Sequence, residues 1–172
     1  MLCCVCVWLQ VDGSAGEIQR SSGVLVCTGT GSTAWMANAA GLHHEEVAAV
    51  LREIGRPSSP AEARAIADRI NLELVFETNS PEVQYFVREP LLPLSTANNA
   101  SLGRGGYSHR HGWAQRVTVR SLGWDAVMSI DGIRLVQLPK GTTAVLNIGR
   151  KPGAPLMVLS LADPNGQPFN KL

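Results

Sequence analysis

The sequence predicts an α+β fold that is mainly β: an antiparallel β-sandwich-like domain with a two-helix insertion at about residues 34–70. Three observations predict it. Runs rich in β-branched residues recur along the chain, the connections between them are short and carry Gly or Pro, and helical spacing of apolar residues appears only in the insertion. The 172 residues are 45% hydrophobic and 17% charged, which fits a single domain, residues 1–172, with a substantial core.

The predicted strands begin with an apolar run at the start of the chain. A secretory signal is the alternative for this run, but it lacks a basic start, so we interpret it as a buried strand. Asp12-Gly13 and Asp131-Gly132 are typical of hairpin turns. The strands are predicted at residues 5–11, 23–28, 73–78, 83–89, 116–122, 124–131, 133–138, 143–148 and 156–161.

Two helices are predicted in the insertion. The first places four apolar residues at helical spacing ahead of Gly55 and Pro57: Val47, Val50, Leu51 and Ile54. The second begins at Ser59, an N-cap residue followed by Pro60 and, at the third helical position, by Glu62. Its apolar face consists of Ala63, Ile66, Ala67 and Ile70.

Charge and length exclude two classes of partner. The formal charge of +1 gives no electrostatic footprint for nucleic acid or anionic lipid. No apolar run approaches the roughly 20 residues that a spanning helix needs. We therefore expect neither a nucleic-acid nor a membrane partner.

The stretch 95–111 is rich in Gly and Asn and is predicted to be a mobile surface loop.

A possible metal cluster, His43-His44-Glu45-Glu46, has a simpler interpretation. Adjacent residues on a helix point about 100° apart, so the four side chains do not converge. Acidic residues are also favoured near the positive end of a helix. The sequence therefore predicts a solvated helix start here and no metal site.

Residues 28–35 are the segment most suggestive of chemistry. They run Thr28-Gly29-Thr30-Gly31-Ser32-Thr33-Ala34-Trp35 and follow a predicted strand, an arrangement that often holds phosphates or dinucleotides. The spacing satisfies the Rossmann fingerprint, but helices continue where that unit needs a second strand ending in an acidic residue. The lysine of a P-loop is also missing. A ligand-binding turn and a plain capped turn remain equally open from these residues alone.

A longer stretch, residues 21–35, resembles the glycine-threonine motif of the NAD kinase family. That motif usually reads Asp-Gly, a strand, then Thr-Pro-Thr-Gly-Ser-Thr-Ala-Tyr. Ser22, Gly29 and Trp35 replace its aspartate, proline and tyrosine, and these departures are similar to the mitochondrial form of the family. So are Phe86-Val87-Arg88-Glu89-Pro90 and the run from Val119 to Gly132.

The resemblance implies an activity and a set of ligands. NAD kinases transfer the γ-phosphate of ATP to the 2′-hydroxyl of the adenosine ribose of NAD, with a divalent metal such as Mg²⁺, and produce NADP. It implies a mitochondrial location, nucleotide partners and a homodimer. It also implies an NAD-binding wall made of Thr30, Ser32, Thr33, Ala34, Trp35 and Asn38, with Ser22 as a weaker candidate.

One part of the family pattern does not occur. The catalytic signature Gly-Gly-Asp-Gly-Thr and the later Asn-Glu or Asn-Asp pair are absent from the sequence. We therefore expect the chain to be the carboxy-terminal half of an NAD kinase, inactive by itself, with no catalytic residue of its own and with any transit peptide upstream of Met1. The alternatives are a non-catalytic oligomerisation or nucleotide-binding module derived from the same fold, and a lipid kinase relative.

Overall fold

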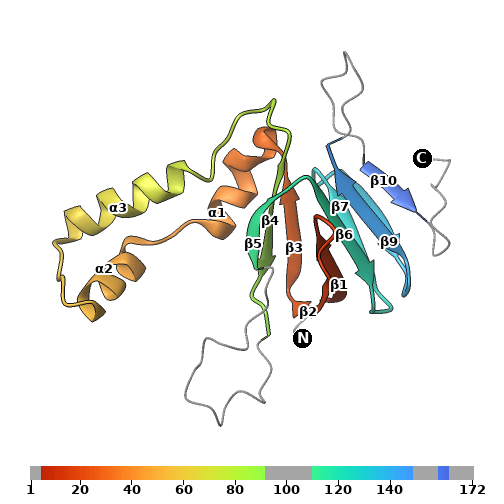
Figure 1. Cartoon of the computed structure of the whole chain (residues 1–172), viewed down its shortest axis with the longest axis horizontal. Helices are drawn as coiled ribbons and strands as arrows, with labels where there is room; N and C mark the ends of the chain where they lie inside the picture. Colours follow the sequence, from red (N-terminus) through yellow and green to blue (C-terminus); the bar gives the residue numbers. More distant parts are fainter. Residues whose placement is uncertain (1–4, 92–109, 149–158, 163–172) are drawn as a thin grey trace, which may run out of the picture. The chain divides into compact units, whose positions relative to one another are not determined.

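The computed structural model describes residues 5–91, 110–148 and 159–162, and its strands and helices confirm the predicted α+β, mainly β class (Figure 1). The strands are β1 (Val5–Val11), β2 (Glu17–Ser21), β3 (Gly23–Cys27), β4 (Val83–Arg88), β5 (His111–Ala114), β6 (Arg116–Ser121), β7 (Ala126–Ile130), β8 (Arg134–Leu138), β9 (Thr143–Asn147) and β10 (Leu159–Ala162). The helices are α1 (Ala37–Ala40), α2 (His44–Glu53) and α3 (Pro60–Leu72), preceded by a 3-10 turn, η1 (Gly29–Gly31), and a π-helical turn, η2 (Ser32–Met36).

The chain separates into two compact units. The first consists of Met1–Val26 with Pro81–Leu172, and the second is Cys27–Ser80. The first carries the sheets and the second carries the helices. That the whole chain forms one domain stays a prediction.

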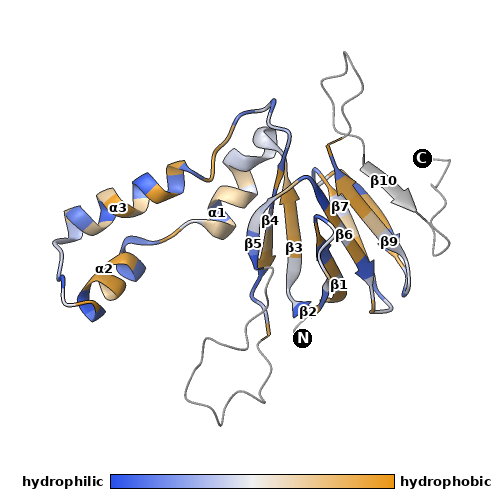
Figure 2. Ribbon diagram, viewed as in Figure 1, coloured by the Kyte–Doolittle hydropathy of each residue, from blue (hydrophilic) through white to orange (hydrophobic). Residues whose placement is uncertain are grey.

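The first unit contains three sheets, of which β7 and β8 form a two-stranded one, and the other two share one core. The five-stranded sheet has the order β10-β9-β6-β1-β2 and the three-stranded sheet the order β3-β4-β5. Both contribute buried side chains to one cluster. Figure 2 draws much of β3 and β9, whose apolar residues pack against this cluster, in the hydrophobic colour. The cluster consists of Leu9, Val11, Val83, Tyr85, Val87, Ala114 and Val117. The predicted sandwich-like packing is therefore present.

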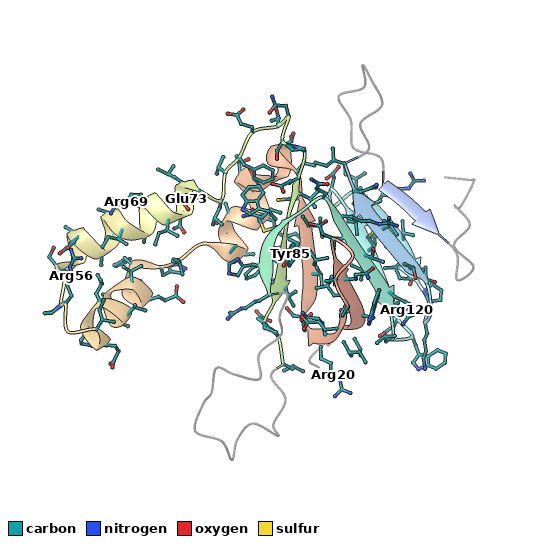
Figure 3. All side chains as sticks on the ribbon, in the orientation of Figure 1. Arg20, Arg56, Arg69, Glu73, Tyr85 and Arg120 are labelled. Atoms are coloured by element: carbon teal, nitrogen blue, oxygen red, sulfur yellow. The ribbon has the colours of Figure 1, made fainter. Side chains whose placement is uncertain are left out.

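Tyr85 is the aromatic residue of this core and is labelled in Figure 3. It stands opposite Gly112 in the β4–β5 ladder, and only 5% of its surface is exposed. A Cβ atom on Gly112 would lie 3.2 Å from the Tyr85 hydroxyl oxygen. The phenol ring therefore packs over the glycine backbone, and its burial raises the pKa of Tyr85, with Glu17 and then Asp12 adding to the shift.

Both predicted Asp-Gly hairpins are confirmed. Asp12 and Gly13 have φ values of 47° and 76° between β1 and β2, and Asp131 and Gly132 have values of 52° and 69° between β7 and β8. Positive φ at both central residues defines the type I′ turn that favours Asp-Gly. Asp12 has a further role, because its Oδ1 accepts hydrogen bonds from the backbone N–H groups of Gln115 (2.9 Å) and Arg116 (2.7 Å).

Several predicted boundaries need correction. The predicted strand at residues 73–78 is wrong: these residues form turns that continue from α3, with Leu74 N–H donating to the Asn71 carbonyl over 3.1 Å. The short strands β2 and β5 were not predicted, and β5 begins at His111, the last residue of the expected loop. The rest of that loop up to residue 109, like residues 156–158 of the last predicted strand, lies outside the described residues.

The second unit contains the predicted helical hairpin. Ser59 caps α3 by accepting a 3.2 Å hydrogen bond from the Glu62 N–H, and Pro60 is its first residue. Val47 of α2 packs against Ala63 and Ala67 of α3 in a small core. Among the residues that the structure describes, no helix is long and apolar enough to cross a membrane.

Candidate functional site

The turn after β3 differs from the regular helix start that the sequence predicts. Gly31 N–H donates to the Thr28 carbonyl over 2.9 Å, which closes η1, and η2 then departs from helical geometry at Ala34 (φ −105°, ψ −109°). α1 adds only four residues before Gly41. A helix dipole therefore contributes little here, and ligand binding would depend on individual side chains and peptide groups.

Ser32 is the internal anchor of this turn. Its side chain is fully buried, and its hydroxyl donates a 2.7 Å hydrogen bond to the Gly29 carbonyl oxygen. The same hydroxyl oxygen accepts a 3.4 Å hydrogen bond from the Phe76 N–H. Ser32 thus ties the turn to the segment that leaves α3, and its hydroxyl points into the protein.

Gly29 allows that segment to approach closely. A Cβ atom at Gly29 would lie 2.6 Å from the Phe76 carbonyl oxygen and closer still to the Glu77 carbonyl. These are rigid backbone atoms, so no side chain fits at position 29 without movement of the chain. The family's usual proline would meet the same obstacle.

Asn38 stabilises the break at Ala34. Its Nδ2 donates a 3.0 Å hydrogen bond to the Ala34 carbonyl oxygen, four residues earlier. Met36, between them, is only 2% exposed and fixes η2 from the inside. The Asn38 amide and the buried Met36 side chain therefore both support the irregular backbone.

The outer surface of the turn carries most of the predicted NAD-binding residues. Trp35 has 58% of its surface exposed, and the other exposed members of the set are Thr30, Thr33, Ala34 and Asn38. The structure thus brings five of the predicted residues to one short surface segment, and it places Ser32 behind them. Ser22 belongs to the first unit, where its N–H donates to the Arg88 carbonyl over 3.1 Å.

The turn is electrically neutral. Residues 28–42 include no charged side chain, so the polar groups of the turn are hydroxyls, an amide, peptide groups and the indole N–H. Within the described parts of the chain, no group of three or more His, Cys, Asp or Glu side chains is placed to hold a metal ion. The His43–Glu46 segment forms the start of α2, where Glu46 Oε2 accepts a 2.9 Å hydrogen bond from the His43 N–H.

Two supporting features were not predicted from the sequence. The Phe76–Glu77 backbone was assigned to a strand, yet it packs on Gly29. Asn71, in the last turn of α3, accepts from the Leu42 N–H over 2.8 Å and donates to the Leu42 carbonyl over 3.0 Å. An asparagine near a helix end carries no pattern that would reveal a partner 29 residues away.

Comparison with known proteins links this chain to one enzyme family. It is 30% identical over 149 residues to the rat protein named NAD kinase 2, mitochondrial, and to the human protein of the same name, matches that cover 83% of this chain. The Xenopus tropicalis protein of that name is 32% identical over 130 residues, or 72% of this chain. The chain is related to the NAD kinase family, in its mitochondrial type.

The relationship to the NAD kinases confirms the resemblance found in residues 21–35. The chain spans about a third of the length of these relatives: 33% of the rat, 32% of the human and 28% of the frog protein. No protein-family model matches the sequence.

Proposed function

We propose that this chain supplies the NAD-binding half of an NAD kinase, which phosphorylates the 2′-hydroxyl of the adenosine ribose of NAD with ATP and yields NADP. The observation that carries the proposal is the exposed surface of the turn at residues 30–38. It gathers Thr30, Thr33, Trp35 and Asn38 on a neutral segment, in a chain related to proteins named as NAD kinases.

The chemistry of this surface suits the adenosine part of NAD. Hydroxyl groups of Thr30 and Thr33 can hydrogen-bond ribose oxygens or the polar edge of a base. The half-exposed indole of Trp35 offers a flat face for a purine ring.

Ser32 and Asn38 hold this surface in shape. The resemblance implies that Ser32 lines the pocket, but its hydroxyl is occupied by Gly29 and Phe76. We infer that Ser32 supports the NAD-binding wall from behind. Asn38 keeps the Ala34 carbonyl satisfied through its amide nitrogen, which leaves its amide oxygen as the group for a ligand. Ser22 stays a candidate on the resemblance alone.

ATP, a divalent metal and the group that activates the acceptor hydroxyl are assigned to the remainder of such an enzyme. The described residues offer no cluster of three or more metal-ligating side chains, so we derive no step through a metal from them. The part played by this chain is binding and orientation of NAD, which is a large share of catalysis in phosphoryl transfer.

A binding titration tests this assignment. NAD is titrated calorimetrically into the natural full-length protein and into its Thr33→Val and Trp35→Ala variants. Loss of one hydrogen bond raises Kd about fivefold, and loss of the indole face about tenfold or more. Because both side chains are exposed, the melting temperature of each variant is expected to stay close to that of the natural protein.

Trp124→Ala is the matched control, because Trp124 belongs to the first unit and is 81% exposed. The Lys140 ammonium group lies over its ring. It is expected to leave NAD affinity unchanged. If Thr33→Val and Trp35→Ala bind NAD like the natural protein, or only lower the melting temperature, the turn is structural and the assignment fails. A protein that binds NAD but forms no NADP would be the non-catalytic module.

A further inference from the structure

The chain runs from the proposed NAD-binding turn into the α2–α3 hairpin and comes back beside the turn after α3. The residues that begin and end the hairpin lie together. Gly41 follows α1 and donates its N–H to the Ala37 carbonyl over 3.0 Å, and Leu42 is the next residue. The Asn71 side chain bonds to both backbone groups of Leu42. Its amide oxygen accepts from the Leu42 N–H over 2.8 Å, and its amide nitrogen donates to the Leu42 carbonyl over 3.0 Å. Arg69 and Glu73, which flank Asn71 near the end of α3, are labelled in Figure 3.

The chain just beyond this base packs on the turn. After Asn71, the peptide groups of Glu73, Leu74 and Val75 donate to the carbonyls of Ile70, Asn71 and Leu72, which makes a tight exit from α3. The next residue, Phe76, donates its N–H to the Ser32 hydroxyl over 3.4 Å. The Phe76 and Glu77 carbonyls then fill the space beside Gly29.

These contacts form a closed frame within the second unit. From Gly29 and Ser32 the backbone continues through α1 to Leu42, which bonds to the Asn71 side chain near the end of α3. From there the chain leads to Phe76, whose N–H bonds back to Ser32. Within this frame, the Asn71 side chain joins the residue before α2 to the last turn of α3. Without it, the segment that leaves α3 would lose one of the contacts that hold it beside the turn.

We propose that Asn71 is a positioning residue for the NAD-binding turn, acting through Phe76 and Ser32 without touching the nucleotide. This inference rests on the proposed function for its consequence, but the coupling itself is a property of the fold. Its geometry predicts that breaking the Asn71–Leu42 pair loosens residues 28–36, which carry the exposed binding groups.

The test measures two quantities on the natural full-length protein and on Asn71→Ala. Amide hydrogen exchange without ligand reports protection at residues 28–36 and 72–77, and calorimetry reports the Kd for NAD. Loss of the pair is expected to speed exchange in both segments and to raise Kd about fivefold to tenfold. Arg64→Ala, an exposed site on α3 outside the frame, is the control and is expected to change neither.

A second variant guards against simple unfolding of the hairpin. Asn71→Asp keeps an oxygen acceptor for the Leu42 N–H and loses the donor to the Leu42 carbonyl, so it is expected to give a smaller effect than Asn71→Ala. Exchange in α2 should stay slow in both variants. Faster exchange throughout α2 and α3, or unchanged exchange at residues 28–36, would overturn the inference.

The two proposals fail in different ways. If the natural protein does not bind NAD but Asn71→Ala still exposes residues 28–36 to exchange, the coupling stands and the proposed function falls. If the natural protein binds NAD and Asn71→Ala binds it equally well with unchanged exchange, the coupling falls and the proposed function stands.

Discussion

The hydroxyl of Ser32 donates a 2.7 Å hydrogen bond to the carbonyl oxygen of Gly29 from a fully buried position. A serine that resemblance places in the wall of a nucleotide pocket is therefore turned away from solvent. It joins the two halves of the turn and also receives the Phe76 N–H. The exposed residues Thr30, Thr33 and Trp35 lie on either side of it along the chain.

Ser32→Ala should lower stability more than Thr33→Val. Removing the Ser32 hydroxyl removes its hydrogen bonds with the Gly29 carbonyl and the Phe76 N–H, which costs about 1–3 kcal/mol in the free energy of unfolding. Thr33 is exposed, so its variant is expected to lose less than about 0.5 kcal/mol. Denaturant unfolding of the two variants measures the difference, and equal stabilities would contradict the role given to Ser32.

Gly29→Ala should destabilise the protein, whereas Gly31→Ala in the same turn should be tolerated. The added methyl group at position 29 meets the Phe76 and Glu77 backbone, and such overpacking costs about 1–3 kcal/mol. At position 31 the new Cβ atom would lie 3.3 Å from the Cys27 Cβ atom, which a small adjustment can relieve. Thermal melting of both variants decides the matter: a Gly31→Ala melt as low as that of Gly29→Ala would disprove close packing at position 29.

Asp12→Ala should cost more stability than Asp12→Asn. The carboxylate accepts two backbone hydrogen bonds at the start of β6, and its residue has a φ of 47°, where alanine is disfavoured. Asparagine tolerates this backbone and keeps one oxygen acceptor, so we expect a loss of about 1 kcal/mol or less, against about 2–3 kcal/mol for alanine. Chemical denaturation of the two variants is the measurement, and the reverse order would contradict this account of the turn.

The buried phenol of Tyr85 should make the protein sensitive to alkaline pH. Its pKa in the folded state lies above the ordinary value of 10.0, mainly because burial disfavours the phenolate. The unfolded chain therefore releases this proton first, and the free energy of unfolding falls as pH rises above about 10, through the folded pKa. Tyr85→Phe removes this contribution, so the stability difference between the two proteins should change as the pH is raised above about 10. A constant difference would show that Tyr85 does not titrate differently on folding.

Most of the β framework could be predicted because its signals are local. Residues 5–11 are apolar apart from Gln10 and include three valines, which predicts β1 with its bounds, and both Asp-Gly turns adopt the backbone that the dipeptide favours. Ser59-Pro60 likewise marks the start of α3. The failures have physical causes: Glu17–Ser21 is polar yet pairs with β1, and the apolar residues at 74–76 continue the turns of α3 instead of forming a strand.

The sequence singled out the surface residues of the candidate turn, whose binding of NAD stays a prediction, but it did not reveal the inner structure of the turn. Thr30, Thr33, Trp35 and Asn38 lie on the surface of the turn, as a binding wall requires. Ser32 bonds to a residue 44 positions away in the chain, and Asn71 bonds to Leu42, 29 positions away. No local sequence pattern encodes either contact. Trp113 and Trp124 have exposed fractions of 41% and 81%, so neither belongs to the core.

The most direct test of the central claim is NADP formation by the natural full-length protein. The protein is incubated with ATP, Mg²⁺ and NAD, and NADP is measured with an NADP-specific dehydrogenase; diacylglycerol and sphingosine serve as competing acceptors. The account predicts ATP-dependent NADP formation that Trp35→Ala reduces and Trp124→Ala leaves unchanged. Phosphorylation of a lipid without any NADP, or NADP formation indifferent to Trp35, would contradict it.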